Sequence, residues 1–179
     1  YNNAHTLNNK LSGEYQECLD KRQTIFNNKS YDFRDDTQSI RDTTWRAKNT
    51  PNFLNKRHIE LTGPGNNKRM VINSFNSSAN AYMLDLEDSM TPSWKNVIQA
   101  HTNIIDATKG TITDVKFDNN NNNIIKEYKI TNENPPSFFV RARGLHMKEN
   151  NIMDEYNPIS ATIFDVGTFM YHNAKYMHE

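Results

Sequence analysis

Apolar side chains are scattered in the first 57 residues, and from residue 58 onward they form regular runs. Residues 58–63 alternate apolar and polar side chains and lead into Gly-Pro-Gly, a pattern typical of a strand followed by a turn. Residues 68–75 place their apolar side chains at helical spacing. The apolar run 81–86 is typical of a buried parallel strand. This part of the chain is therefore predicted to alternate strands and helices.

The same alternation is predicted to continue downstream. Thr91 is a candidate N-cap with Pro92 at the first helical position, so a helix is expected from there to about residue 107, where Gly110 follows. The other expected elements are strands 111–117 and 124–130 forming a hairpin, a strand 137–144 and a helix 160–177. The asparagine run 119–123 has no apolar side chain to bury and is expected to be an exposed loop.

This order of elements predicts an α/β fold with a parallel sheet or barrel. Three strand–helix units are present, whereas a (β/α)8 barrel needs eight, so the chain would hold less than half of such a barrel. Residues 1–57 are polar, with one amphipathic helix predicted at 14–26. Taken alone, that segment is not expected to form a domain.

Composition narrows the classes of function. The 179 residues carry a formal net charge of zero, which gives no electrostatic reason to expect a nucleic acid or an acidic membrane as partner. Mean hydropathy is −0.89, and no apolar run reaches the roughly 18 residues of a spanning helix. The lone Cys18 can form no internal disulfide and lacks the companions of a zinc site, which favours a reducing compartment. The chain starts at Tyr1, and residues 176–179 continue a helical pattern, so a fragment is expected.

Two groups of polar side chains follow predicted strands, where α/β barrels place their functional groups. Acids facing basic groups there would suit a small anionic substrate, with or without a divalent cation. The alternative is a structural network in which the acids cap the next helix and pair with the arginines. The two groups are Asp85, Glu87, Asp88 and Ser89 after one strand, and Arg141, Arg143 and His146 after another.

Five blocks of the chain carry a family signature. They are 40–45 (IRDTTW), 57–64 with 68–73 (RHIELTGP, KRMVIN), 84–89 (LDLEDS), 140–146 (VRARGLH) and 160–173 (SATIFDVGTFMYHN). In this order they resemble the malate synthase family of the A type. The match covers most of the chain from about residue 15, and five separate matches make a specific signal.

The resemblance implies a fold and a reaction. Malate synthases are TIM barrels with an N-terminal helical clasp and a C-terminal helical domain. Residues 1–57 would be the clasp, and 58–179 the first three or so units of an incomplete barrel with a hairpin insertion around 111–130. The family condenses acetyl-CoA with glyoxylate and hydrolyses the product to malate and CoA. Mg²⁺ holds glyoxylate, an aspartate removes a proton, and an arginine stabilises the developing charge.

The resemblance also implies roles for single residues. Arg141 matches the catalytic arginine, whereas Arg143 would orient or pack its loop. Ser89 would contact acetyl-CoA, and Glu87 and Asp88 would lie near the metal without binding it. The metal ligands and the catalytic aspartate are expected outside this chain, which is expected to be inactive alone. The partners would be the two small substrates, with no nucleic acid or membrane, in a peroxisome or glyoxysome if the source is eukaryotic and otherwise in the cytoplasm.

Two alternatives remain open at this stage. Citrate-lyase-like acyl-CoA C–C lyases share the turn after the first strand, the LDLED block and a strand that ends in Val-Arg. Gly144, Leu145 and His146, with the end of the 160–173 block, favour malate synthase. The other alternative is a truncated product without catalytic activity.

Overall fold

The computed structural model describes residues 2–118 and 123–177, which fall into two compact units, Tyr1–Asn52 and Phe53–Glu179. The first unit contains the long helix α1 (Asn2–Asn28), the 3-10 turn η1 (Asp35–Thr37) and the short helix α2 (Gln38–Arg41). The helix predicted at 14–26 is confirmed, but it begins earlier. Ion pairs one turn apart, such as Lys10–Glu14 at 3.9 Å, lie along its exposed surface. The assignment of residues 1–57 as a clasp stays a prediction.

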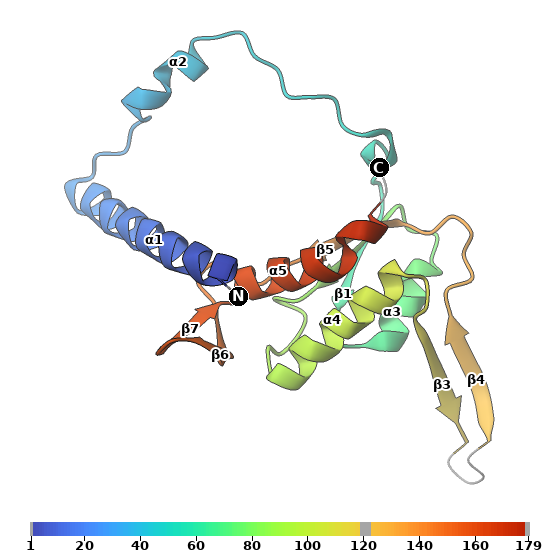
Figure 1. Cartoon of the computed structure of the whole chain (residues 1–179). Helices are drawn as coiled ribbons and strands as arrows, with labels where there is room; N and C mark the ends of the chain where they lie inside the picture. Colours follow the sequence, from blue (N-terminus) through green and yellow to red (C-terminus); the bar gives the residue numbers. More distant parts are fainter. Residues whose placement is uncertain (1, 119–122, 178–179) are drawn as a thin grey trace. The chain divides into compact units, whose positions relative to one another are not determined.

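A three-stranded parallel sheet forms the centre of the second unit (Figure 1). Its strands are β1 (Glu60–Pro64), β2 (Ala81–Asp85) and β5 (Ser137–Arg141), in the order β1-β2-β5. The helices are α3 (Lys68–Phe75), α4 (Trp94–Thr108) and α5 (Ala161–Asn173), with the 3-10 turns η2 (Asn52–Leu54) and η3 (Ala174–Tyr176). This order confirms the predicted parallel α/β arrangement, and α3 has the predicted bounds.

The helices cover one face of the sheet, which decides where the other side chains point. Tyr82 and Leu84 of β2 are fully buried in a core with side chains of α3 and α4. Phe138 and Val140 of β5 pack against the same core. Because side chains alternate along a strand, Asp85 and Arg141 lie on the opposite face. Both are the last residues of their strands and are register partners.

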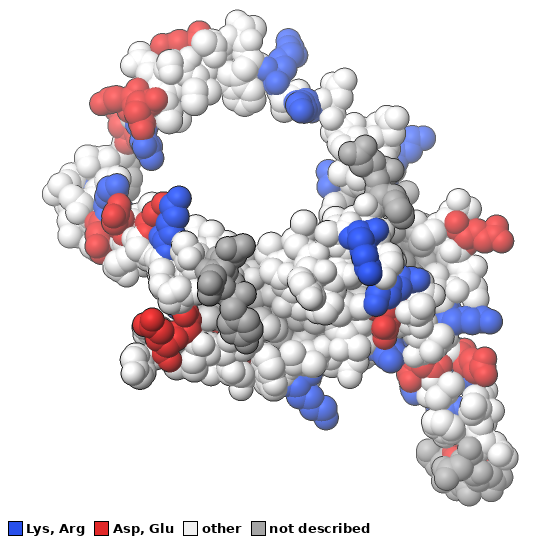
Figure 2. Space-filling view, in the orientation of Figure 1, with Lys and Arg blue, Asp and Glu red and all other residues white. Residues whose placement is uncertain are grey.

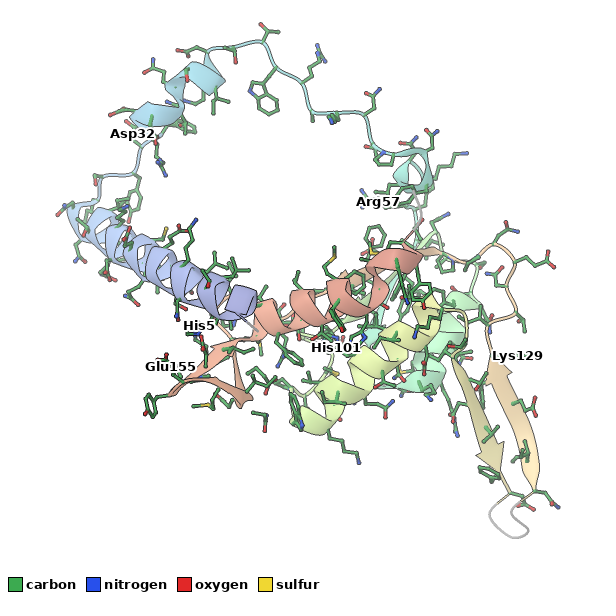
Figure 3. The ribbon with its side chains drawn as sticks, viewed as in Figure 1. His5, Asp32, Arg57, His101, Lys129 and Glu155 are labelled. Atoms are coloured by element: carbon green, nitrogen blue, oxygen red, sulfur yellow. The ribbon has the colours of Figure 1, made fainter. Side chains whose placement is uncertain are left out.

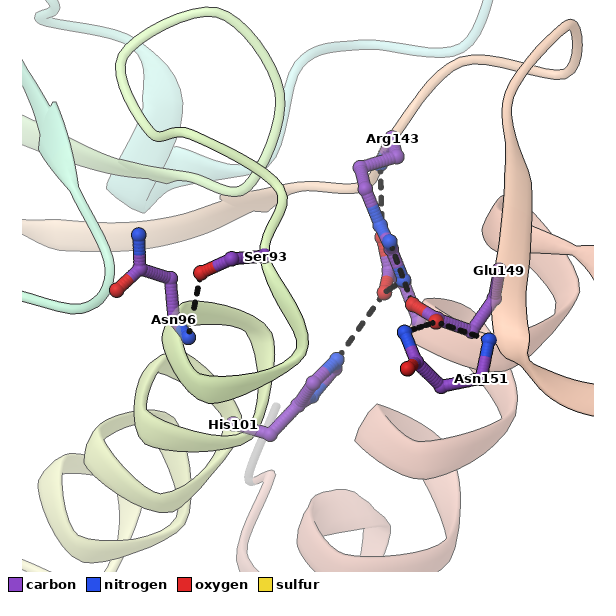
Figure 4. Close-up of polar contacts among 7 residues, drawn as sticks. Ser93, Asn96, His101, Arg143, Glu149 and Asn151 are labelled. Carbon is purple, nitrogen blue, oxygen red and sulfur yellow. Dashed lines mark hydrogen bonds and ion pairs between the residues drawn. The ribbon is translucent and has the colours of Figure 1, made fainter.

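The predicted start of α4 is wrong. Its N-cap is Ser93, whose hydroxyl accepts a hydrogen bond from the Asn96 amide at 3.4 Å, so Thr91 and Pro92 lie before the helix (Figure 4). Val97, His101 and Ile104 are buried, whereas Trp94 and Ile98 are about two-fifths exposed. After α4, Gly110 adopts φ +70°, which suits glycine at a helix end. Helix α5 is shorter than predicted, since it ends at Asn173.

Two hairpins complete the second unit. The predicted one pairs β3 (Thr113–Phe117) with β4 (Ile124–Lys129). The hairpin projects away from the helices, and Lys129 lies at the end of β4 that is nearer to them (Figure 3). Most of the asparagine run between them, 119–122, lies outside the described residues. The second hairpin, β6 (Lys148–Asp154) with β7 (Asn157–Ser160), was missed because β6 is mostly polar and lacks strand alternation. Glu155 forms its turn with φ +53°.

Two asparagines attach the end of the first hairpin to α3. The Asn132 amide group donates to the carbonyls of Phe75 and Ser77 at 3.2 and 3.0 Å, where the helix leaves carbonyls without partners. The Asn76 side chain accepts from the backbone of Thr131 and Asn132 and donates to Lys129.

We expect Asn132→Ala to lower the free energy of unfolding by about 1–2 kcal/mol, because partly buried carbonyls lose their donor. Urea unfolding of the complete polypeptide that contains this chain measures the loss. Asn73→Ala, on the exposed side of α3, is the matched control and should change stability by less than about 0.5 kcal/mol. Equal effects of the two substitutions would contradict the attachment role.

Candidate active site

The carboxyl edge of the sheet brings together the acids and one of the arginines that the sequence singles out. The Leu86 amide donates to the Arg141 carbonyl at 3.0 Å, which extends the ladder between β2 and β5 by one step. This places the loop that follows β2 beside the end of β5. The Arg141 guanidinium lies 3.6 Å from the Asp85 carboxylate. The acids after β2 and Arg141 at the end of β5 therefore lie at one edge of the sheet, as the sequence predicted.

Asp85 organises the loop that carries the other acids. Its side chain is buried, one oxygen accepts from the Glu87 amide at 2.8 Å, and the other accepts from the amide and hydroxyl of Ser89 at 3.2 and 2.7 Å. Burial raises the pKa of Asp85, but these hydrogen bonds together with Arg141 outweigh burial and hold that pKa below its ordinary value. Asp85 is thus ionised at neutral pH and fixes the turn of residues 86–89.

The guanidinium of Arg141 forms ion pairs, while part of the side chain remains exposed to solvent. Its Nη2 contacts the carboxylates of Glu87 and Asp88, the latter at 2.7 Å. The hydrogen bond with Asp88, with the charges of the neighbouring acids, raises the pKa of Arg141 above its ordinary value. The side chain nevertheless remains 38% exposed. A fixed, permanently charged guanidinium with open surface is a binding group for an anion or a developing oxyanion.

Arg143 lies two residues beyond the end of β5, in a buried network (Figure 4). It is 2% exposed, and its guanidinium donates twice to Asp165 of α5, at 2.9 and 2.8 Å, and once to Glu149 of β6, at 2.8 Å. The Arg143 backbone amide also donates to Asp165 at 2.9 Å. His101 of α4 contacts the same carboxylate at 3.1 Å. The alternative of a structural network thus describes Arg143, whereas Arg141 remains partly open.

The sequence reasoning missed the partners in this network. Asp165, Glu149 and His101 come from three elements that α5, β6 and α4 bring together, and none follows a predicted strand of the sheet. The block 160–173 contains Asp165, but nothing in its local pattern marks that residue as buried. His146, which the sequence grouped with the arginines, is exposed, and its ring lies beside Gly144 rather than on Arg141.

A polar pocket of about 590 Å³ adjoins Ser89. Lys68 and Arg69, at the start of α3, contribute its positive charge. Arg69 donates to Asp114 at 2.5 Å and to the Val115 carbonyl at 3.0 Å, whereas Lys68 makes no such bond within the described residues. The pocket is lined by Pro64, Asn66, Asn67, Lys68, Arg69, Ser89, Met90, Thr91, Asn96 and Asp114.

The described residues contain no group of three or more His, Cys, Asp or Glu side chains placed to hold a metal ion. None of the helices in the described part of the chain is long and apolar enough to cross a bilayer. Basic and acidic side chains are interspersed on the face shown in Figure 2, in keeping with the net charge of zero. The charged groups that matter here are therefore local, at the edge of the sheet.

A charged site at the carboxyl edge of a parallel α/β sheet is the arrangement by which α/β enzymes bind small polar substrates. No family model matches the chain. Curated relatives do match it over most of its length. By sequence, the chain is similar to malate synthases along most of its own length and corresponds to a part of those proteins.

Three relatives illustrate the match. A bifunctional glyoxylate cycle protein of Caenorhabditis elegans is 35% identical over 177 residues, which are 96% of this chain and 18% of the relative. Malate synthase A of Escherichia coli (strain K12) is 36% identical over 155 residues, 87% of this chain and 28% of the relative. A glyoxysomal malate synthase of Candida tropicalis is 34% identical over 176 residues, 95% of this chain and 31% of the relative. The chain thus spans less than a third of these relatives.

Proposed function

We propose that the polypeptide containing this chain is a malate synthase, which condenses acetyl-CoA with glyoxylate and hydrolyses the thioester product to (S)-malate and CoA. The observation that carries the proposal is Arg141. It stands at the carboxyl end of β5, is oriented by acids of the neighbouring loop, and keeps part of its guanidinium side chain open. The match to malate synthases over most of the chain supports the same reaction.

Arg141 would act on the oxygen where negative charge develops. When an acetyl-CoA enolate attacks an aldehyde, charge moves onto the aldehyde oxygen, and a guanidinium fixed beforehand stabilises it without reorganising. The contacts with Glu87 and Asp88 supply that fixation. The planar fork of arginine can also contact the Glu87 carboxylate and a substrate oxygen at once, which a lysine cannot do.

We propose that the enzyme binds Mg²⁺ through ligands that lie outside residues 1–179. The described residues do not form its ligand set, so we assign no step to the metal here. Glu87 and Asp88 are committed to Arg141, and we propose that they lie near the ion and add negative charge around it. The aspartate that removes the acetyl proton would likewise come from outside residues 1–179.

We propose that Ser89 and its pocket receive part of the CoA moiety. The Ser89 hydroxyl donates to Asp85, which leaves its oxygen able to accept a bond. Lys68 and Arg69 line the pocket together with one carboxylate, Asp114, which is paired with Arg69, so the pocket keeps a net positive charge that suits CoA phosphates. The pocket adjoins the loop that orients Arg141, so a thioester lying there would reach the same sheet edge.

The parallel sheet supports a TIM barrel as its complete form. In the described sheet β1 and β5 each pair with β2 alone, so each leaves one side open for a further strand. Arg141 and Asp85 face away from the covering helices, which in a barrel is the inside. Residues 58–179 would then be its first three or so units, with 1–57 as an N-terminal clasp. In a eukaryotic source we propose a peroxisome or glyoxysome as the compartment, and otherwise the cytoplasm.

We expect the complete polypeptide to release free CoA thiol when acetyl-CoA and glyoxylate are mixed, and to stop when excess EDTA is added. A thiol reagent follows the release, and acetyl-CoA without glyoxylate is the control. An unchanged rate in EDTA would exclude the metal requirement. If the polypeptide instead cleaved a malyl-type thioester and made none, the lyase alternative would replace malate synthase.

A further inference from the structure

The two oxygens of the Glu87 carboxylate face different neighbours. Oε2 contacts Nη2 of Arg141. Oε1 lies against Gly144, since a Cβ atom added at Gly144 would be only 2.7 Å from it. The same added atom would lie 2.7 and 2.8 Å from two ring atoms of His146. Real Cβ atoms essentially never come within 3.0 Å of another heavy atom, so only a glycine leaves Glu87 where it is.

We propose that Gly144 is a positioning residue for Arg141, acting through Glu87; this rests on the proposed function of Arg141. Gly144 leaves the space in which the Glu87 carboxylate lies against the loop after β5 and, from there, orients the guanidinium. A glycine is required at position 144 because of the space that it leaves, and not because of an unusual backbone conformation. Gly110 is the glycine with positive φ in the described chain, so an alanine at position 144 meets no backbone strain.

The neighbours of Gly144 decide what an added methyl group would displace. His146 is exposed and can turn into solvent, but its departure leaves the conflict with Glu87 unchanged. The Glu87 backbone is held by Asp85 at 2.8 Å, so its side chain has to move. Because that side chain is flexible, the move costs little folding free energy, but it removes the contact with Arg141. The structure therefore separates an effect on the site from an effect on stability.

Two other glycines provide matched controls. A Cβ at Gly65 would meet Leu84 at 2.6 Å and Ala100 at 2.9 Å, both in the core, so Gly65→Ala should lower the melting temperature. A Cβ at Gly167, on α5, would meet nothing within 4 Å, so Gly167→Ala should leave activity and stability close to the parent protein.

The test compares these three variants in the complete polypeptide. For Gly144→Ala we expect kcat to fall about tenfold or more, with the melting temperature and the KM for acetyl-CoA nearly unchanged. A wild-type kcat, or a lower melting temperature that accounts for the loss as in Gly65→Ala, overturns the proposal.

A double-mutant cycle with Glu87→Ala shows whether Gly144 acts through Glu87. Once the carboxylate is gone, the methyl group has nothing to displace, so Gly144→Ala should have little further effect on kcat. Losses that simply multiply in the double variant would show that Gly144 acts by another route.

A crystal structure of Gly144→Ala separates this inference from the proposed function. If the parent polypeptide makes no malate, the proposed function fails, yet the structure still reports whether Glu87 has left Arg141. If the added methyl group is accommodated while the Glu87–Arg141 contact persists, the positioning role is wrong whatever reaction the enzyme catalyses.

Discussion

Replacing Arg141 by lysine in the complete polypeptide is expected to lower kcat at least about a hundredfold, in the range seen when an oxyanion donor is removed. Lysine keeps the positive charge but loses the planar fork that can contact Glu87 and a substrate oxygen together. The fold should survive, because the Arg141 side chain is partly exposed. Steady-state kinetics on the purified variant, with its melting temperature as control, measures the effect.

Arg143→Lys provides the comparison that tests the assignment of Arg141. The Arg143 guanidinium touches Asp165 and Glu149 but is almost fully buried, so its replacement should reduce stability more than kcat. The ranking in kcat decides the question. If both variants are folded and Arg143→Lys is the more damaging one, then Arg141 is not the catalytic arginine.

Asp165→Asn is expected to lower the free energy of unfolding by about 3 kcal/mol or more, the usual result of breaking a buried ion pair from one side. Asp165 is 1% exposed and accepts from the guanidinium and the backbone of Arg143, with His101 beside it. Without its charge, Arg143 keeps only Glu149 as a charged partner among the described residues. Urea unfolding of the complete polypeptide measures the loss, and a change below about 1 kcal/mol would contradict the role of the network.

The same variant should change how stability depends on pH. Burial raises the pKa of Asp165, but the hydrogen bonds from His101 and Arg143 lower this pKa by more than burial raises it. The folded-state pKa therefore lies below the ordinary value of 3.8. A carboxylate with a depressed pKa contributes stability above its unfolded pKa and loses it as pH falls through the folded pKa. Stability of the parent protein should therefore fall below about pH 4, less steeply in Asp165→Asn. Glu133→Gln, at an exposed position, should keep the parent slope.

The apolar pattern predicted most of the second unit because its strands and helices are specified locally. The strand β2 is apolar on both faces, and α3 has its buried side chains at helical spacing, so both could be read along the chain. The start of α4 could not, since both Thr91 and Ser93 are suitable N-caps and only the path of the chain after β2 selects Ser93. The hairpin of β6 and β7 was missed because its sequence is mostly polar and Glu149 is buried there by a distant arginine.

By itself, the sequence determined where the candidate chemistry lies. Parallel strands end at one edge of a sheet, so acids after β2 and an arginine at the end of β5 had to meet there, and strand alternation turned Arg141 away from the helix-covered face. Which arginine stays open was decided only by the tertiary structure. Arg143 has the same parity as Arg141 but is enclosed by Asp165, 22 residues further on, and that carboxylate also contacts His101, 64 residues before it. Contacts over such separations depend on how α4 and α5 pack, which no local pattern along the chain encodes.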